Sequence, residues 1–167
     1  MPFQATRSRS STPAPELDLT AIVNMDDEVS DLDSQLLHPI GIVRSPLKDR
    51  KSAPNQGAEG APDARIEIAP SVLEGLEGIA VGDELIVVTW LHESRRDVLK
   101  THPRGDKSVP LAGVFATRSP DRPNPLGLHR VVVLGIAGRE LTVGPLEAID
   151  GTPVIDIKPV LQVSRDW

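Results

Sequence analysis

Residues 128–143 read LHRVVVLGIAGRELTV, and they carry the strongest structural signal in the chain. Valine and isoleucine, which favour strands, crowd residues 131–136, and residues 140–143 resume the pattern after a short Ala-Gly connection. Two such runs joined by a short glycine-containing connection are typical of a β-hairpin. Residues 84–91, ELIVVTWL, form another run of the same kind. The sequence therefore predicts β structure at the centre of the fold.

Further short runs extend this pattern along the chain. The predicted strands are residues 39–44, 64–69, 84–91, 114–117, 128–136, 140–143 and 153–159. Only residues 70–78 and 94–101 are predicted to be briefly helical. Short strands separated by glycine and proline turns indicate an all-β barrel or sandwich, because the helices are too few to cover a parallel sheet.

The composition excludes several classes of protein. The chain has 167 residues, enough for one domain with its own core and a tail. It contains no cysteine, which excludes disulfide scaffolds, thiolate metal sites and cysteine nucleophiles. It has no run of about 20 apolar residues, and no apolar segment follows Arg7 and Arg9 as in a secretory signal. We expect a soluble, cytoplasmic protein with no membrane partner.

Charge divides the chain into two parts. Residues 1–37 hold two arginines against seven acidic residues, and their first half is rich in Ser, Thr, Pro and Ala. We expect an acidic, partly flexible N-terminal arm over residues 1–37 and a globular domain over residues 38–167. Residues 90–130 hold eight Lys and Arg against four acids. This local excess of positive charge attracts phosphates or forms an ordinary solvated surface, and charge alone leaves both readings open.

Nucleotide-binding and metal-binding motifs are missing from the sequence. No GxGxxG follows a predicted strand, and no GxxxxGK[ST] occurs. The four histidines lack the spacing of metal ligands, so no metal is expected. They are His38, His92, His102 and His129.

The segment 113–130, GVFATRSPDRPNPLGLHR, is the most informative for function. Its three prolines each fix a backbone angle and restrain the preceding residue. Arg118, Arg122 and Asn124 stand among these prolines, so a stiff loop holds polar groups at set positions. Such a loop suits a small-molecule or phosphate site, since little entropy is lost on binding. It equally suits a structural crossover between two strands.

Other short motifs accompany this segment in a fixed order. The chain reads RSP, PNQ, WLHE, HPRG, GVFATRSPDRPNPLGLH and DGTPVIDIKP in turn. This order resembles the TsaA/TrmO (YaeB-like) family of S-adenosylmethionine-dependent tRNA methyltransferases, over residues 38–160. The resemblance implies a small single-sheet β-barrel with short helical turns, working as a homodimer. It also implies methylation of the exocyclic nitrogen of threonylcarbamoyl-adenosine at position 37 of tRNA, with no metal and no DNA partner.

The resemblance also implies which residues contact S-adenosylmethionine. These are Pro54, Asn55, Gln56, His92, Glu93, Arg118, Leu128, Ile149, Asp150, Gly151 and Thr152.

Three polar residues are the candidates for catalysis. Asp150 is the candidate for the amino group or the cation of the cofactor. Arg118 and Arg122 suit a phosphate or carboxylate of the acceptor, because a guanidinium binds two oxygens at once. For Arg122, a surface ion pair with Asp121 or Asp150 is an equal alternative. Five further cations are candidates for contact with an RNA backbone: Arg95, Arg96, Lys100, Arg104 and Lys107.

The sequence departs from the family pattern in three ways. Asn55 stands where the family often has arginine, and Val160 stands where it often has tyrosine. Some members continue into a C-terminal domain, whereas this sequence ends at Trp167. Two alternatives to a tRNA methyltransferase therefore stay open. One is a methyltransferase that acts on a small molecule, and the other is a sensor or interaction module that binds S-adenosylmethionine without turnover.

Overall fold

A computed structural model describes residues 36–161 of the chain. The predicted arm, residues 1–37, lies almost entirely outside the described residues, and its boundary with the globular domain stays a prediction. Across residues 36–161, no helix has the length and apolar character needed to cross a membrane.

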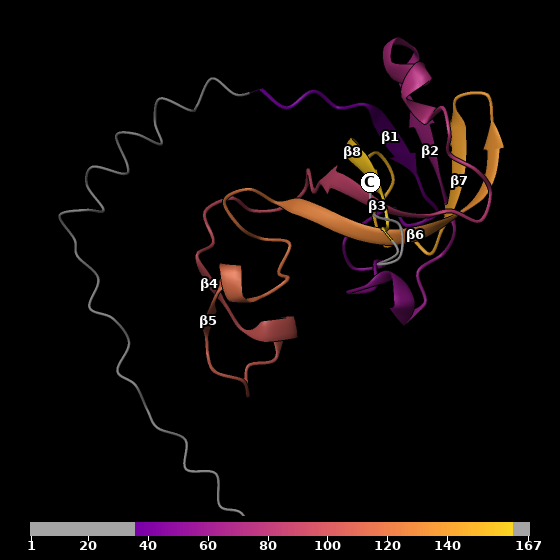
Figure 1. The fold of residues 1–167 in the computed structure, drawn as a ribbon. Coiled ribbons are helices and arrows are strands. Elements are labelled where there is room, and N and C mark those ends of the chain that lie inside the picture. Colours follow the sequence, from indigo (N-terminus) through magenta and orange to yellow (C-terminus); the bar gives the residue numbers. More distant parts are fainter. Residues whose placement is uncertain (1–35, 162–167) are drawn as a thin grey trace, which may run out of the picture. The chain divides into compact units, whose positions relative to one another are not determined.

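Six antiparallel strands pair in a closed ring (Figure 1). Each strand has two neighbours, in the order β1-β2-β7-β6-β3-β8, and β8 returns to β1. The described residues are therefore mostly β, as the sequence predicted. The ring consists of β1 (Gly41–Arg44), β2 (Ala64–Ile68), β3 (Glu84–Trp90), β6 (Leu126–Ala137), β7 (Glu140–Gly144) and β8 (Pro153–Pro159).

The predicted hairpin is present as β6 and β7. Ala137 pairs with Glu140, and Gly138 between them has a φ of 59°, which favours glycine. β6 is the longest strand of the ring, and it also pairs with β3 from Glu84↔Val132 to Trp90↔Leu126. One strand thus joins the hairpin to β3, its other neighbour in the ring.

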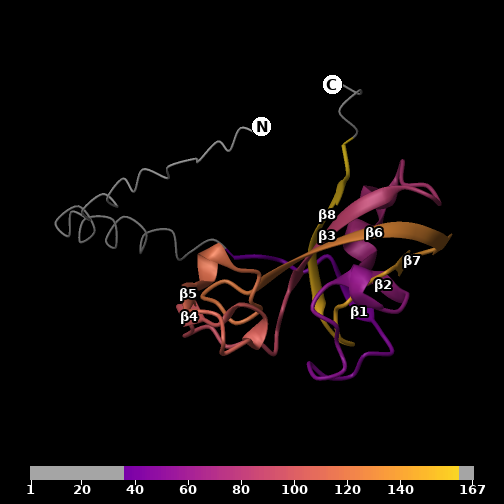
Figure 2. The ribbon, with the colours of Figure 1, turned by 90° about the horizontal axis from the view of Figure 1, so that it is seen from below.

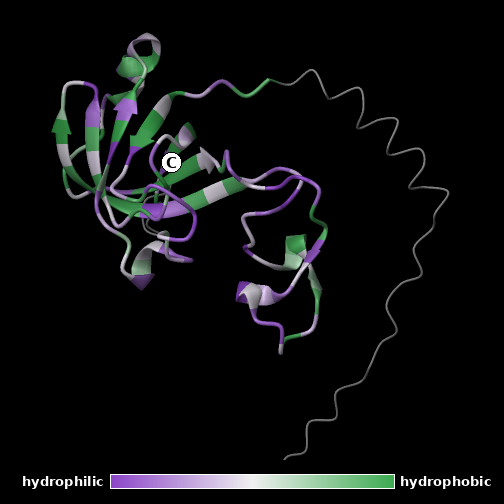
Figure 3. Cartoon of the chain, turned by 180° about the vertical axis from the view of Figure 1, so that it is seen from behind, coloured by the Kyte–Doolittle hydropathy of each residue, from purple (hydrophilic) through white to green (hydrophobic). Residues whose placement is uncertain are grey.

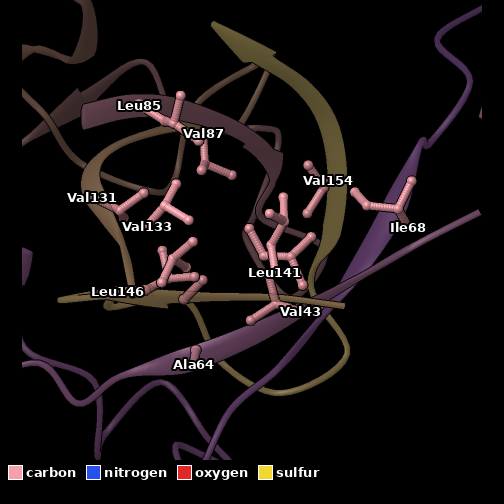
Figure 4. Close-up of a cluster of buried hydrophobic side chains, with 13 residues drawn as sticks. Val43, Ala64, Ile68, Leu85, Val87, Val131, Val133, Leu141, Leu146 and Val154 are labelled. Atoms are coloured by element: carbon pink, nitrogen blue, oxygen red, sulfur yellow. The ribbon is translucent and has the colours of Figure 1, made fainter. Parts of the chain in front are cut away.

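The core fills the interior of this ring. Burial alternates along β3 and along the first eight residues of β6, so every second side chain there points inward. Figure 3 shows hydrophobic residues, in green, along the strands of the ring. Figure 4 shows Leu85 and Val87 of β3 gathered with Val131 and Val133 of β6 and with Leu141 of β7. All five side chains are buried. Their burial supplies the main hydrophobic stabilisation of the fold.

Two of the predicted elements are wrong. Residues 114–117, predicted as a strand, contain the 3₁₀ helix η4 (Val114–Ala116). Residues 94–101, predicted as helical, end in the short strand β4 (Lys100–Thr101). The backbone of Arg95 bonds to residues 121 and 122 of the proline-rich loop, and this long-range pairing replaces helical hydrogen bonds.

The segment between β3 and β6 forms a small structure of its own, seen as the β4 and β5 pair in Figure 2. β4 pairs with β5 (Ala112–Gly113), and η3 (Pro103–Gly105) lies between them in the chain. We call residues 91–125 the excursion. Two more 3₁₀ helices complete the described elements: η1 (Gly57–Glu59) and η2 (Pro70–Leu76). The latter confirms the helical turn predicted over residues 70–78.

Replacing Leu141 by alanine should lower the free energy of unfolding by about 2–5 kcal/mol, because its side chain is 0% exposed and a cavity remains. Chemical denaturation measures this loss. Leu134→Ala is the control, since Leu134 is 46% exposed and its truncation leaves no cavity. A loss at Leu141 no larger than at Leu134 would contradict the assigned core.

Candidate functional site

A cleft of 1170 Å³ lies where the excursion meets one part of the barrel. Five stretches of the chain line it: residues 53–58, 91–94, 101–105, 116–122 and 126–132. The connection between β7 and β8 completes the lining. Ten of the predicted site residues line this cleft: Pro54, Asn55, Gln56, His92, Glu93, Arg118, Arg122, Leu128, Ile149 and Thr152.

Asp150 and Gly151 are not among the lining residues of this cleft. One Asp150 oxygen accepts a hydrogen bond from the Ser45 N–H at 3.0 Å, and the other lies 3.0 Å from Lys48 Nζ. These two contacts hold the pKa of the Asp150 carboxyl below its ordinary value. Asp150 lines a separate cavity of 470 Å³ instead. The predicted contact between Asp150 and the cofactor cation therefore has no support in this arrangement, because the carboxylate anchors the turn.

Gly151 stabilises the turn over residues 149–152, which also contains Asp150. Its φ of 80° is in the left-handed region that favours glycine, and its N–H donates to the carbonyl of Val43. The neighbouring Thr152 is buried, and its hydroxyl donates to the carbonyl of Ile149 at 2.7 Å. The turn is thus fixed by its own bonds, and Ile149 and Thr152 are held facing the cleft.

Arg118 has an exposed side chain at the cleft. It follows the helix η4, not a strand as the sequence predicted. Among residues 36–161, no carboxylate forms an ion pair with it. Its guanidinium is thus available for an anionic group in the cleft.

Arg122 is bound to the loop that carries it. Its Nε donates to the carbonyl of Ser119 at 2.9 Å, and its Nη2 donates to the carbonyls of Val114 and Thr117. The alternative of an ion pair with Asp121 or Asp150 is not seen, because Asp121 pairs with Arg50 at 2.9 Å. Arg122 therefore closes the proline-rich loop, and few of its donors are left for a substrate.

A buried polar chain in the cleft was missed by the sequence analysis. Thr89 Oγ1 lies 2.8 Å from His129 Nε2, and His129 Nδ1 lies 2.8 Å from Glu147 Oε1. The Glu147 oxygen is off the direction of a well-aligned hydrogen bond, so this second contact is mainly electrostatic. Burial raises the pKa of the Glu147 carboxyl, but His129 and the Gly57 N–H outweigh it and the pKa lies below its ordinary value.

Gly127 makes room for this chain. A Cβ at position 127 would lie 2.5 Å from both His129 Nε2 and Thr89 Oγ1. Gly127 pairs with Thr89 across the β3–β6 ladder, and His129 pairs with Val87. The sequence does hold a sign of this group of three side chains. Every second residue of β6 points inward, and this alternation places His129 on the same side as Val131 and Val133. A histidine in that row is a buried polar group that needs partners.

The cations predicted to contact RNA lie in the excursion, and several have partners there. Arg95 pairs with Asp97 at 2.8 Å, and Arg104 pairs with Glu59 at 3.0 Å. Arg96 lies over the Trp90 ring at 5.3 Å from its centroid. Lys100 and Lys107 are exposed, and the part of the chain that the structure describes offers neither an ion pair. Within that same part, no group of three or more acidic or histidine side chains is placed to hold a metal ion.

Replacing Arg122 by alanine should lower the free energy of unfolding by about 1–3 kcal/mol, because three loop carbonyls lose a charged donor. Limited proteolysis should show faster cleavage within residues 114–125. Arg122→Lys should recover little, since one ammonium cannot reach all three acceptors. Arg65→Ala, which removes an exposed pair with Glu140, is the control and should cost about 0–1 kcal/mol. An Arg122→Ala variant as stable as this control would show that the three hydrogen bonds from Arg122 do not stabilise the fold.

Comparisons with known proteins agree on one family. The sequence is 44% identical over 131 residues to a probable S-adenosyl-L-methionine-binding protein from Methanothermobacter thermautotrophicus, covering 78% of this chain and 93% of the relative. It is 37% identical over 126 residues to the probable S-adenosyl-L-methionine-binding protein VirR from Rhizobium radiobacter, covering 75% and 71%.

A solved structure and a family model point the same way. The fold matches a crystal structure of TrmO from P. aeruginosa with a TM-score of 0.62 and 28% sequence identity. The match covers 80% of this chain but only 60% of the TrmO chain, so this chain spans less than two thirds of that protein's length. Residues 42–164 match the model of the tRNA-methyltransferase O N-terminal domain. The chain therefore belongs to the tRNA-methyltransferase O N-terminal domain family.

Proposed function

We propose that the protein is an S-adenosylmethionine-dependent methyltransferase that acts on tRNA, at the exocyclic nitrogen of threonylcarbamoyl-adenosine. One observation carries the proposal: a single cleft collects ten predicted site residues from segments far apart in the sequence. Family membership and the names of the relatives support both the cofactor and the RNA acceptor.

The lining of the cleft fits the chemistry of S-adenosylmethionine. Its volume of 1170 Å³ exceeds the roughly 1,000 Å³ at the upper end of typical small-molecule pockets, which leaves room for part of an acceptor. Leu128 and Ile149 offer apolar surface for the adenine ring, while Asn55 and Gln56 offer amides for its polar edge. The bound cofactor would supply an activated methyl group.

In this proposal, the residues of the cleft mainly hold the cofactor and the acceptor in position for methyl transfer. Transfer of a methyl group to a nitrogen requires the two reacting atoms in line, so a rigid site supplies much of the rate. The proline-rich loop, closed by Arg122, is such a rigid element. Arg118 next to it is our candidate for the acceptor's carboxylate or a phosphate. Lys100 and Lys107 are exposed and have no ion pair among the described residues, so they stay our candidates for contact with an RNA backbone.

The proposal is tested by incubating the full-length protein with labelled S-adenosylmethionine and bulk tRNA, with and without EDTA. We expect label in tRNA, recovered after nucleoside digestion as a methylated threonylcarbamoyl-adenosine and unaffected by EDTA. Cofactor binding with label in no RNA would favour the small-molecule enzyme or the sensor. Failure to bind the cofactor in calorimetry would refute the proposal.

Arg118→Ala should lower methyl transfer at least tenfold, about 1.4 kcal/mol, if its guanidinium binds the acceptor or cofactor. Its thermal stability should change little, because the side chain is exposed. Arg118→Lys should restore only part of the rate, since an ammonium lacks the planar fork. Arg139→Ala, exposed at the β6–β7 turn, is the control. Unfolding of Arg118→Ala with normal transfer per folded molecule would instead assign Arg118 to the fold.

We also propose a homodimer. The excursion exposes several large apolar side chains, among them Phe115 at 82%, with Leu99 and Leu111 nearby in the sequence. Apolar surface of this kind is typical of contact with another chain. Light scattering should give twice 18.0 kDa. Phe115→Ser should shift the mass toward the monomer, whereas Leu134→Ser on β6 should not; a monomeric wild-type protein would rule the dimer out.

A further inference from the structure

The cleft contains a half-buried carboxylate that does not come from any motif quoted above. Glu147 lies in the connection between β7 and β8, three residues before Asp150, and its side chain is 18% exposed. Within residues 36–161, no lysine or arginine pairs with Glu147. Asp121 and Glu84 line the same cleft, but each is neutralised by an arginine. Glu93 also lines the cleft but is exposed, so Glu147 is the half-buried acid of the cleft that no lysine or arginine neutralises among the described residues.

The groups that border the Glu147 carboxylate are a histidine ring and a backbone N–H. His129 Nδ1 lies 2.8 Å from one carboxylate oxygen, and His129 Nε2 lies 2.8 Å from the Thr89 hydroxyl, which fixes the ring between the two side chains. The second carboxylate oxygen lies beside Gly57, whose N–H also stabilises the ionised form. The group remains an anion that is fixed on two sides.

This arrangement favours a diffuse cation over a strong hydrogen-bond donor. One oxygen of Glu147 lies 2.8 Å from His129 Nδ1 and the other lies beside Gly57, so little space is left around the carboxylate for a further donor and its main remaining attraction is that of its charge. Its chain neighbours Leu146, Ala148 and Ile149 are buried apolar residues. An ammonium is strongly hydrated and would lose its water there, whereas a sulfonium has no N–H and is poorly hydrated.

We propose that Glu147 is the anionic group that binds the sulfonium of S-adenosylmethionine, and that His129 and Thr89 are positioning residues that fix it. The inference rests on the proposed cofactor. It transfers to Glu147 the role that the sequence suggested for Asp150, whose carboxylate is occupied by Lys48 and Ser45.

A carboxylate in this position would let the site bind the cofactor more tightly than its product. S-adenosylhomocysteine differs from S-adenosylmethionine by one methyl group and by the positive charge on sulfur. The attraction to Glu147 acts on the charged molecule and is lost with the neutral one. The wild-type site should therefore prefer the cofactor and release the product.

Calorimetry on the full-length protein tests this with both molecules as probes. Glu147→Gln should weaken binding of S-adenosylmethionine about tenfold and change binding of S-adenosylhomocysteine less than about twofold. Equal weakening of both molecules would overturn the proposal and leave Glu147 a structural role. Unchanged binding of S-adenosylmethionine would also overturn it. A melting curve checks folding, and if Glu147→Gln is unfolded, Glu147→Asp replaces it, with a smaller loss expected for the cofactor alone.

His129→Gln tests the positioning role. It should weaken S-adenosylmethionine selectively, and combining it with Glu147→Gln should add nothing, because His129 acts through the carboxylate. Additive losses would overturn that role.

The control is Glu67→Gln, which removes the ion pair with Arg44 on β1 and β2, outside the cleft. It should change neither affinity. Failure of the wild-type protein to bind either molecule would instead refute the proposed function, so the two outcomes are distinguishable.

Discussion

The pairing of β3 with β6 is the interaction on which both the core and the cleft depend. This ladder has seven paired positions, from Glu84↔Val132 to Trp90↔Leu126. At one end it sets Leu85 against Val131 in the core, and at the other it sets Thr89 against Gly127. A shift of one residue would turn every one of these side chains to the other face. The register that packs the barrel is thus the register that assembles the Thr89–His129–Glu147 chain.

Hydrogen bonds and ion pairs made by polar side chains, not helices, give the cleft its shape. The proline-rich loop lacks regular structure, yet Arg122 binds three of its carbonyls and Asp121 accepts from the Arg95 N–H. Asp121 also pairs with Arg50, which in turn donates to the carbonyl of Glu93. Polar side chains therefore connect three loops that have few buried apolar groups of their own. The loops are held at fixed positions before any ligand arrives, which lowers the entropy lost on binding.

The sequence predicted the strands of the ring well, because they alternate or concentrate β-branched residues, and β6, β7 and β8 end at or next to a glycine or proline. It failed over residues 114–117, where Val114 is buried but the proline-rich loop tightens the backbone into a helical turn. The role of Asp150 at the cofactor stays a prediction, and the sequence could not show its contact with Lys48, because that contact is made across the fold. Glu147 and His129 come together from β6 and a later connection, and only the tertiary structure shows that pairing.

The excursion leaves the barrel after Trp90 and rejoins it at Leu126, and these two residues are paired with each other in the β3–β6 ladder. A segment whose two ends meet in this way can be lengthened, shortened or exchanged while the ladder beneath it keeps its register. The barrel side of the cleft carries Leu128, Glu147 and Ile149, and the excursion side carries His92, Arg104 and Arg118. If the proposed function holds, a chimaera that takes residues 91–125 from a relative would exchange Arg118, our candidate for the acceptor, together with the predicted cofactor contacts His92 and Glu93, while the β3–β6 ladder stays unchanged.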